Sequence, residues 1–298
     1  MSIRIAVLIT CHNRREKTLA CLKSVFGQRL NDELCLSVYV VDDGSVDGTY
    51  EAIKLAYPSV RLIKGDGNLY WNGGMRVAYA ESQKQDYDYY LWLNDDAVLY
   101  ENAFLALVNV HAADSESEFN SSIIVGSTCD PIKRELTYGG WKKTSSANPF
   151  RMVKVAPSAE RPIECDTVNG NCVLVPREVK EKVGNLDSVF THGMGDMDYG
   201  LRAKKAGCSI WIAPGYVGTS ELNAAVGLFT DEALPLLVRW KRMVGPKGLP
   251  PKEWLVFTCR HAGWLWPLYW INPYVKFWAR AGISQLTSGL GKIFRSAG

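Results

Sequence analysis

The sequence predicts an α/β protein with a mostly parallel central sheet flanked by helices, followed by a separate helical tail. Apolar, strand-like runs alternate with helical patterns through the first half of the chain, which is typical of strands joined by crossover helices. Apolar residues make up 47% of the 298 positions, so the chain can bury a sizeable core. The tail differs because it is rich in Trp and in basic residues.

The regular alternation occupies the first half, about residues 1–125. Its apolar runs are rich in β-branched and aromatic residues, and their spacing indicates a sheet covered on both faces. The expected strands are 3–10, 36–41, 60–64 and 89–93, and the expected helices are 15–27, 47–57, 75–83 and 101–112.

The rhythm changes in the second half, about residues 126–230, which we assign to the same domain. Residues 136–165 are rich in Gly, Ser and Pro, which predicts hairpins and loops. The expected strands are 123–127, 172–175 and 209–212, and the expected helices are 176–183 and 196–206.

The expected extension, residues 231–298, has helical patterns at 232–244 and 252–281 that prolines interrupt. From Arg239 onward ten Lys and Arg stand against one acid, which gives the tail +9 and leaves the rest of the chain at −6. Six of the ten Trp also lie there. Trp beside Lys and Arg suits a membrane–water interface. The alternative, equally open, is a helical element that packs on protein or forms a dimer contact.

The eight cysteines form no CxxC pair and no compact disulfide rhythm, so they indicate reduced thiols and a cytosolic setting. The opening run, Ile3 to Ile9, lacks the basic and cleavable apolar regions of a signal peptide. We therefore expect a cytoplasmic protein, either free or bound peripherally at the inner face of the cell membrane.

Two adjacent carboxylates, Asp95 and Asp96, follow the expected strand 89–93 directly. In an open α/β sheet, ligands bind outside the carboxyl ends of the strands. Neighbouring acids repel each other unless a cation lies near them, and Mg²⁺ or Mn²⁺ with phosphates is one such arrangement. The alternative is an Asx-rich turn that closes the strand.

Two other strands end in polar residues. Thr10 to Arg14 follow the first strand, and Asp42 to Ser45 follow the second. A carboxylate at the second strand can accept from a base or ribose, although capping of the next helix is an alternative. Strand ends of this kind meet at one crevice.

A glycine-rich stretch runs from Gly65 to Arg76. It offers backbone N–H groups and one cation at the start of a helix, an environment that suits a diphosphate. A loop plugged by aromatic side chains is the alternative. The residues of interest are Gly67, Asn68, Trp71, Gly74 and Arg76.

The ordered set of these motifs resembles inverting family 2 glycosyltransferases with the Rossmann-like GT-A fold, over about residues 3–220. Residues 166–177 and 195–202 resemble that family's acceptor-side segments. Bacterial polysaccharide enzymes of the rhamnosyl- and galactosyltransferase type are the relatives that it most resembles.

The resemblance implies donor-site roles for a UDP- or dTDP-sugar. Asp43 would accept from the base, while Asp95 would face the ribose or the donor sugar. Asp96 would hold Mg²⁺ or Mn²⁺ on the diphosphate. The other donor-site residues are Thr10, Asn13, Arg14, Gly67, Asn68, Trp71, Gly74 and Arg76.

The resemblance also implies that Asp196 is the general base, with helix capping as the alternative role. The other acceptor-side residues are Asn169, Gly170, His192, Asp198 and Arg202. His192 would contact the acceptor or the diphosphate, or it is an ordinary loop histidine.

Two positions depart from the family pattern. Gly195 stands where the family often has Glu, so the base is Asp196 unaided, or Asp198. Residues 213–220 lack the histidine that many relatives use as a metal ligand, so the metal is held more weakly or is completed by water.

The expected function is transfer of a hexosyl group from a UDP- or dTDP-sugar to a lipid-linked glycan acceptor during bacterial surface polysaccharide (lipopolysaccharide or capsule) synthesis. No nucleic acid partner is expected. Two alternatives stay open. A sugar nucleotidyltransferase would place Gly, Arg and Lys after the first strand, where this chain has Thr10 to Arg14. A non-catalytic sugar-nucleotide binder would tolerate the missing Glu and His.

Overall fold

The computed structural model describes residues 2–30, 34–114, 121–222 and 227–295, with the side chains of the last helix described as far as Arg280. It separates the chain into two compact units, residues 1–224 and 225–298. The division predicted from the sequence lies a few residues later, after residue 230.

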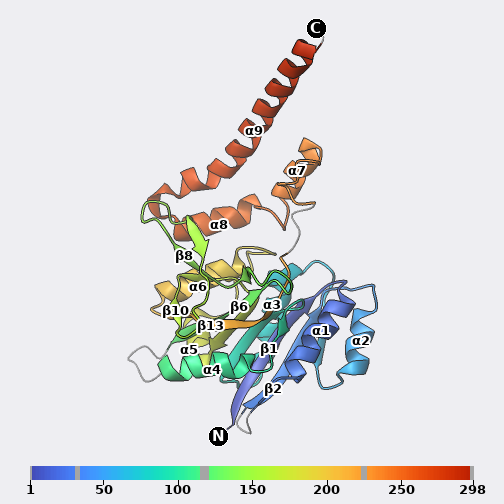
Figure 1. The fold of residues 1–298 in the computed structure, drawn as a ribbon, viewed down its shortest axis with the longest axis vertical. Helices are drawn as coiled ribbons and strands as arrows, with labels where there is room; N and C mark the ends of the chain where they lie inside the picture. Colours follow the sequence, from blue (N-terminus) through green and yellow to red (C-terminus); the bar gives the residue numbers. More distant parts are fainter. Residues whose placement is uncertain (1, 31–33, 115–120, 223–226, 296–298) are drawn as a thin grey trace. The chain divides into compact units, whose positions relative to one another are not determined.

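The first unit is built on one large mixed sheet, with a small second sheet beside the hairpins (Figure 1). The strands are β1 (Ile3–Cys11), β2 (Leu34–Asp42), β3 (Arg61–Lys64), β4 (Tyr89–Asn94), β5 (Val98–Leu99), β6 (Ser122–Cys129), β7 (Leu136–Tyr138), β8 (Gly140–Lys143), β9 (Met152–Lys154), β10 (Ile163–Glu164), β11 (Thr167–Val168), β12 (Cys172–Pro176) and β13 (Ser209–Thr219).

The large sheet has the order β10–β13–β6–β12–β4–β1–β2–β3, with β5 paired to β13 and β7 to β6. Strands β1 to β4 are parallel, as the alternating pattern predicts. Strand β12 is antiparallel to both of its neighbours, β4 and β6. The hairpin region supplies β8, β9 and β11, which form the small sheet in the order β11–β8–β9.

Helices cover both faces of the large sheet (Figure 1). The helices of this unit are α1 (Arg15–Phe26), α2 (Thr49–Ala56), α3 (Tyr70–Ser82), α4 (Ala103–Asp114), α5 (Arg177–Val183) and α6 (Gly195–Lys205). One core holds the side chains on one face of β1 with α1, α2 and α4, and the other holds the opposite face with α3, α5 and α6. Successive strand residues point to opposite faces, so a near-continuous apolar strand fills both cores.

The glycine-rich stretch differs from its prediction. A loop is expected as far as Gly74, whereas α3 begins at Tyr70. A Cβ on Gly74 would overlap the hydroxyl of Thr10, so the glycine lets α3 lie directly against the end of β1. Glycine is needed here for close packing inside a helix and not for loop flexibility.

Strand β13 runs well past its predicted end at Ile212. Its pairing with β6 shifts register between Ile212 and Tyr216, where Gly215 has φ +66°. The strand then resumes as far as Thr219. This extension carries Ser220 to the carboxyl end of β4.

The second unit contains α7 (Leu236–Met243), α8 (Pro251–His261), a 3₁₀ turn (Gly263–Leu265) and α9 (Trp266–Arg295). Its own small core is built on Met243, Tyr274 and Phe277. Among the described residues, no helix combines the length and apolar character that crossing a membrane requires.

Pro273 lies inside α9, where the sequence predicts a break. A proline removes the helical hydrogen bond to the carbonyl four residues earlier, which is that of Tyr269. The indole N–H of Trp254 donates to this carbonyl at 3.2 Å. The helix tolerates the proline because a side chain of α8 satisfies the carbonyl.

Candidate active site

The register of the parallel strands brings the predicted site residues together. Thr10 on β1 pairs with Asn94 on β4, and Cys11 pairs with Asp42 on β2. The polar residues after β1 therefore lie between the acids that follow the two neighbouring strands. This is the sheet edge at which α/β proteins bind ligands.

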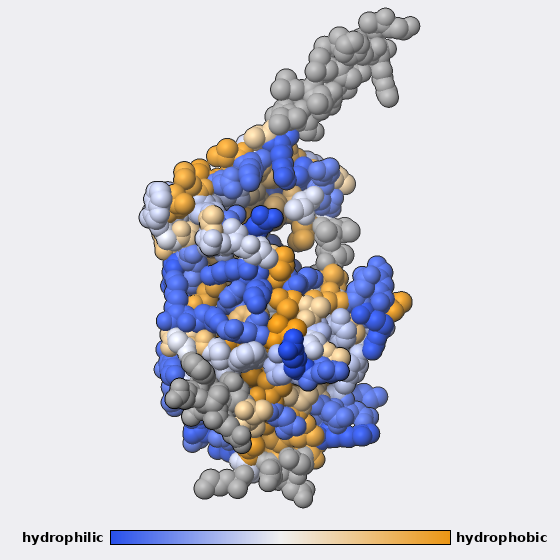
Figure 2. All heavy atoms as spheres, turned by 60° about the vertical axis from the view of Figure 1, so that its left-hand side comes forward, coloured by the Kyte–Doolittle hydropathy of each residue, from blue (hydrophilic) through white to orange (hydrophobic). Residues whose placement is uncertain are grey.

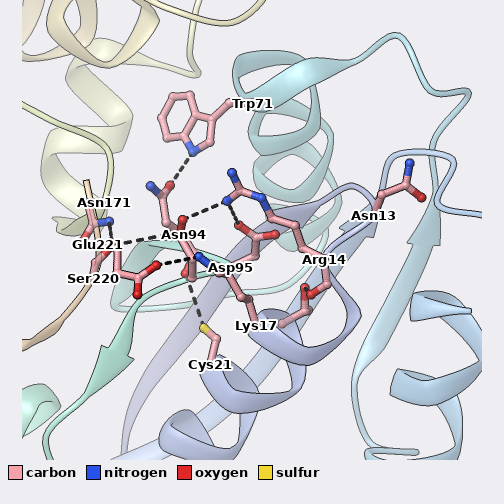
Figure 3. A network of polar contacts seen from close by, with 12 residues as sticks. Asn13, Arg14, Lys17, Cys21, Trp71, Asn94, Asp95, Asn171, Ser220 and Glu221 are labelled. Carbon is pink, nitrogen blue, oxygen red and sulfur yellow. Dashed lines mark hydrogen bonds and ion pairs between the residues drawn. The ribbon is translucent and has the colours of Figure 1, made fainter. Parts of the chain in front are cut away.

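Arg14 joins the acid pair at the end of β4 (Figure 3). Its Nη1 lies 3.1 Å from Asp95 Oδ1 and 2.8 Å from Asp96 Oδ2. The two acid side chains are 8% and 4% exposed, whereas that of Arg14 is 38% exposed. The cation that the adjacent acids require is thus supplied by the protein itself.

The carboxyl group of Asp95 remains incompletely satisfied. Burial raises its pKa to about 6, even though the charge of Arg14 favours the ionised form. Its Oδ2 is buried and has no hydrogen-bond partner among the described residues. Partial burial lowers the pKa of Arg14, but the charges of Asp95 and Asp96 outweigh this and raise it.

Asp96 has neighbours that the sequence did not single out. Ser220 Oγ donates to Asp96 Oδ1 at 3.4 Å, and Asn171 Nδ2 donates to Ser220 Oγ at 3.3 Å. Ser220 belongs to the segment in which the expected histidine is missing. A hydroxyl therefore lies against Asp96 there.

The acid pair has some, but not all, of the features of a metal site. Among the described residues, no group of three or more His, Cys, Asp and Glu side chains lies close enough together to hold a metal ion. The acid pair still has the oxygen chemistry that Mg²⁺ and Mn²⁺ prefer, and the buried Oδ2 of Asp95 has no hydrogen-bond partner among the described residues. The pair would therefore suit a divalent cation.

Asp43, predicted to bind the base, organises the glycine-rich stretch. Its Oδ1 accepts from the N–H of Gly67 at 2.8 Å, and its Oδ2 accepts from the N–H of Tyr70 at 2.9 Å. The neighbouring Asp42, which the sequence reasoning left unassigned, accepts from the N–H of Ser45 at 3.1 Å. Asp43 thus fixes the chain that leads into α3.

Asn13 and the neighbouring His12 connect the ends of β1 and β2. Asn13 has φ 51° and accepts from the N–H of Val46 at 2.8 Å, and its own N–H donates to Ser45 Oγ at 2.9 Å. Asn tolerates this left-handed conformation better than most residues. Exposed Asn68, in contrast, has its N–H bound only locally, to Asp66 Oδ1 at 2.9 Å.

Trp71 links the predicted donor side of the site to its predicted acceptor side. Its indole N–H donates to Asn94 Oδ1 at 2.8 Å (Figure 3). A Cβ on Gly170 would overlap the ring of Trp71, so Gly170 lies directly on it. The N–H of Gly170 in turn donates to Asp196 Oδ2 at 2.9 Å.

Asp196, the predicted base, lies in the first turn of α6. Its Oδ1 accepts from its neighbour Met197 N–H at 2.8 Å. Burial raises the pKa of Asp196, although the backbone N–H groups of Gly170 and Met197 act in the opposite direction. A carboxylate held in place and made more basic by burial suits general base chemistry.

The structure explains why glycine occupies position 195. A Cβ there would overlap Oδ1 of Asn72, which is fully buried. Asn72 is fixed because its Nδ2 donates to the carbonyls of Asp187 at 2.9 Å and Phe190 at 2.6 Å. The Glu side chain that relatives often carry at this position has no room.

Asp198 and Arg202 have structural surroundings. Asp198 is fully buried, and its Oδ2 lies 2.7 Å from Arg202 Nε. Arg202 also donates to the carbonyls of Val183 at 2.8 Å and Asn185 at 3.1 Å. Both residues attach α6 to the end of α5.

The remaining predicted residues lie at the edges of the site. The ring of His192 lies edge-on to Tyr70, with centroids 6.1 Å apart. Arg76 Nε donates to the carbonyl of Leu186 at 3.0 Å. The N–H of Asn169 donates to the carbonyl of Gly139 at 3.1 Å. Of these residues, His192 joins the acceptor-side chain to the donor-side stretch.

A Rossmann-like sheet with acids at its carboxyl edge, a glycine-rich stretch and a separate buried carboxylate form the arrangement expected of a glycosyltransferase with the GT-A fold. Residues 6–157 match the family model described as glycosyl transferase family 2. Since this is more than half of the chain, the protein belongs to the family 2 glycosyltransferases and is an enzyme.

Known proteins resemble it at two levels. The chain is 27% identical, over 81% of each sequence, to an N-acetylglucosaminyl-diphospho-decaprenol L-rhamnosyltransferase from two strains of Mycobacterium tuberculosis, CDC 1551 / Oshkosh and H37Rv. A crystal structure of GalNAc-T7 with UDP, GalNAc and Mn²⁺ superposes with a TM-score of 0.56 at 16% identity. The match covers 73% of this chain and 42% of the GalNAc-T7 chain, and it establishes the fold alone.

Proposed function

We propose that the protein transfers a hexosyl group, of the rhamnosyl or galactosyl type, from a UDP- or dTDP-sugar to a lipid-linked glycan acceptor in bacterial surface polysaccharide synthesis. The observation that carries this proposal is the continuous contact from the acid pair through Asn94, Trp71 and Gly170 to Asp196. It connects the groups suited to a nucleoside diphosphate with a base. The rhamnosyltransferase relative, whose name includes a lipid-linked sugar, supports the acceptor class.

In the proposed reaction Asp196 accepts the proton of the acceptor hydroxyl. The acceptor oxygen forms a bond to the anomeric carbon while the bond from that carbon to the diphosphate oxygen breaks. The electron pair of the broken bond leaves with the nucleoside diphosphate. A single displacement inverts the anomeric centre and requires no nucleophile from the protein.

The donor side is proposed to bind the nucleoside diphosphate at the edge formed by Thr10, Asn13 and the stretch that Asp43 fixes. Asp95 would face the ribose or donor sugar, and Asp96 would hold the cation. Mg²⁺ or Mn²⁺ bound there would neutralise the charge that develops on the departing diphosphate.

Arg14 is proposed to compete with the cation for the acid pair. In the structure its guanidinium occupies the acid pair, so a divalent cation at this pair competes with it. Its planar donors are also suited to a phosphate group, so a displaced guanidinium would be able to pair with the diphosphate. Arg14 would thus neutralise the acids in the absence of the cation.

The proposed place of action is the cytoplasm, with peripheral attachment at the inner face of the membrane, since a lipid-linked acceptor is held there. Asp198 and Arg202 are assigned to the packing of α6, and His192 with Asn169 and Gly170 to the acceptor side.

The proposal is tested by adding UDP-sugars and dTDP-sugars, with and without Mn²⁺, and measuring the melting temperature. We expect one nucleotide to raise it and Mn²⁺ to increase the effect, because a ligand that binds only the folded state stabilises it. Turnover with a polyprenyl-diphosphate-linked sugar then identifies the acceptor. Stabilisation without turnover of any lipid-linked or free acceptor would favour a non-catalytic binder, and no stabilisation by any nucleotide-sugar would contradict the proposal.

A further inference from the structure

A stripe of exposed apolar side chains runs along the start of α9, preceded by Trp264 in the 3₁₀ turn. The four members within α9 follow one another at intervals of three and four residues, which places them on one face of the helix. We call this set the outer stripe: Trp264, Leu268, Ile271, Val275 and Trp278, with exposures of 86, 64, 42, 57 and 43%.

The outer stripe is distinct from the small core of the second unit except at Trp278, whose ring centroid lies 5.2 Å from that of Trp240 and 5.6 Å from that of Phe277. Trp270, Tyr274 and Phe277 of the same helix belong to the small core around Met243. Helix α9 thus has one apolar face that packs internally and a second that remains exposed. On the second unit, Figure 2 shows apolar atoms directly beside hydrophilic ones.

The charged side chains of α9 are all basic. Lys276 and Arg280 of α9 are exposed, and α9 contains no acid. The single acid from Arg239 onward is Glu253, which is only 6% exposed. An apolar stripe bordered by basic side chains complements a surface that is apolar inside and anionic outside.

We propose that the outer stripe binds an anionic lipid bilayer, with the first part of α9 lying in the interface plane. The two Trp rings suit the headgroup region, and Leu268, Ile271 and Val275 would enter the acyl boundary. Lys276 and Arg280 would meet anionic headgroups. A second copy of the chain is a poorer occupant, because it would bring the same positive charge to the contact.

This surface deepens the proposed function, on which its biological role rests, since it would hold the enzyme where a lipid-linked acceptor is embedded. The binding itself depends only on the second unit's side chains. Membrane binding and catalysis can therefore fail separately.

The test uses the full chain and vesicles of phosphatidylcholine, with or without phosphatidylglycerol, and measures co-sedimentation. The wild-type protein should bind the anionic vesicles and bind the neutral ones more weakly. The double variant Leu268→Glu with Val275→Glu should lose about tenfold or more in partitioning, because two apolar contacts are lost and two like charges are added.

Matched and milder variants keep the test decisive. Leu55→Glu with Ile132→Glu changes two residues of the first unit that are 86 and 87% exposed, and this variant should bind as the wild type does. Lys276→Gln with Arg280→Gln leaves the apolar residues intact and should weaken anionic binding by about fivefold per charge removed. Circular dichroism verifies that each variant is folded.

Equal binding by the outer-stripe and control variants would overturn the proposal, as would absence of binding by the wild type. Sedimentation velocity without vesicles covers the other occupant: a dimer that Leu268→Glu with Val275→Glu dissociates, together with absent vesicle binding, assigns the stripe to self-association. The nucleotide-sugar melting assay on the same samples tests the catalytic function independently, because it needs no membrane.

Discussion

Asp196 and Asp198 lie two positions apart on α6 but have different surroundings. Asp196 accepts hydrogen bonds from two backbone N–H groups at the end of the contact path from the acid pair. Asp198, in contrast, is fully buried against Arg202. These surroundings are consistent with the proposed proton transfer at Asp196 and with a packing role for Asp198.

We expect Asp196→Asn to lower kcat by about 10²–10⁴-fold while donor binding is kept, because the amide cannot accept the proton. Asp198→Asn, the matched control, should instead lower the melting temperature, because Arg202 loses its charged partner. Steady-state turnover and the donor-induced melting shift distinguish the two. Wild-type turnover in Asp196→Asn would remove Asp196 as the base.

The pH dependence of the reaction should reflect the burial of Asp196. Burial raises its pKa, and the base acts only when deprotonated, so kcat/KM should rise with pH through this raised pKa and level off above it. The acidic limb should therefore lie at a higher pH than an ordinary aspartate gives, which is about 4. An unshifted limb in the pH–rate profile would contradict the assignment.

Arg14 allows a prediction about the cation that does not depend on turnover. Arg14→Gln should bind Mn²⁺ about tenfold more tightly in the absence of donor, because the acid pair loses the cation that competes for it. Lys17→Gln is the control, since Lys17 lies in the first turn of α1, just after Arg14, but pairs with exposed Glu221. Electron paramagnetic resonance of free Mn²⁺ measures both, and equal affinities would show that Arg14 does not compete.

The sequence pointed to candidate site residues where functional groups are adjacent within one stretch of the chain. Adjacent acids after an apolar run identify Asp95 and Asp96 at once. Asn171 and Ser220 were missed because each is an isolated polar residue in its own stretch. Only the pairing of β12 and β13 within the sheet brings them to β4, and no pattern in a single sequence encodes that contact.

At the scale of elements, Gly195, the first residue of α6, packs directly against Asn72. Gly195→Ala should destabilise the fold by about 1–3 kcal/mol, since the added methyl group must displace a buried, hydrogen-bonded side chain. Gly193→Ala, two positions earlier, has open space around the added atom and should be nearly neutral. Chemical denaturation measures the difference, and equal stabilities would show that Asn72 gives way easily.

The elements show why periodicity succeeded in some places and failed in others. The parallel strands β1 and β4 were predictable because burial on both faces leaves a continuous apolar run. The early start of α3 was not, since Trp71, Gly73 and Gly74 suggest a loop until their packing is known. Pro273 suggested a break, and only the indole of Trp254 explains its place within α9.

At the scale of the molecule, the two units have separate cores. Met243 is 2% exposed in the small core of the second unit, and the residues of the proposed active site belong to the first. Met243→Ala should cost about 2–5 kcal/mol in the unit that contains it, because it leaves a cavity. Donor binding should stay unchanged. Calorimetry with and without nucleotide-sugar tests this, and loss of the donor response would show that the cores are coupled.

The whole-molecule division was visible in composition, because charge and Trp content change together after Arg239. Composition did not show what the exposed face of α9 binds, since Trp residues lie on both of its apolar faces. Trp270 packs inward and Trp278 is 43% exposed, although the two are only eight residues apart.

The overlap between Asn72 and position 195 also constrains how this enzyme can diverge. A lineage that gains a longer side chain at 195 must first, or simultaneously, lose the amide at 72, and with it the support for the carbonyls of Asp187 and Phe190. Neither change is neutral alone. The two positions should therefore vary as a pair among related sequences, with Asn accompanying Gly and a smaller residue accompanying Glu.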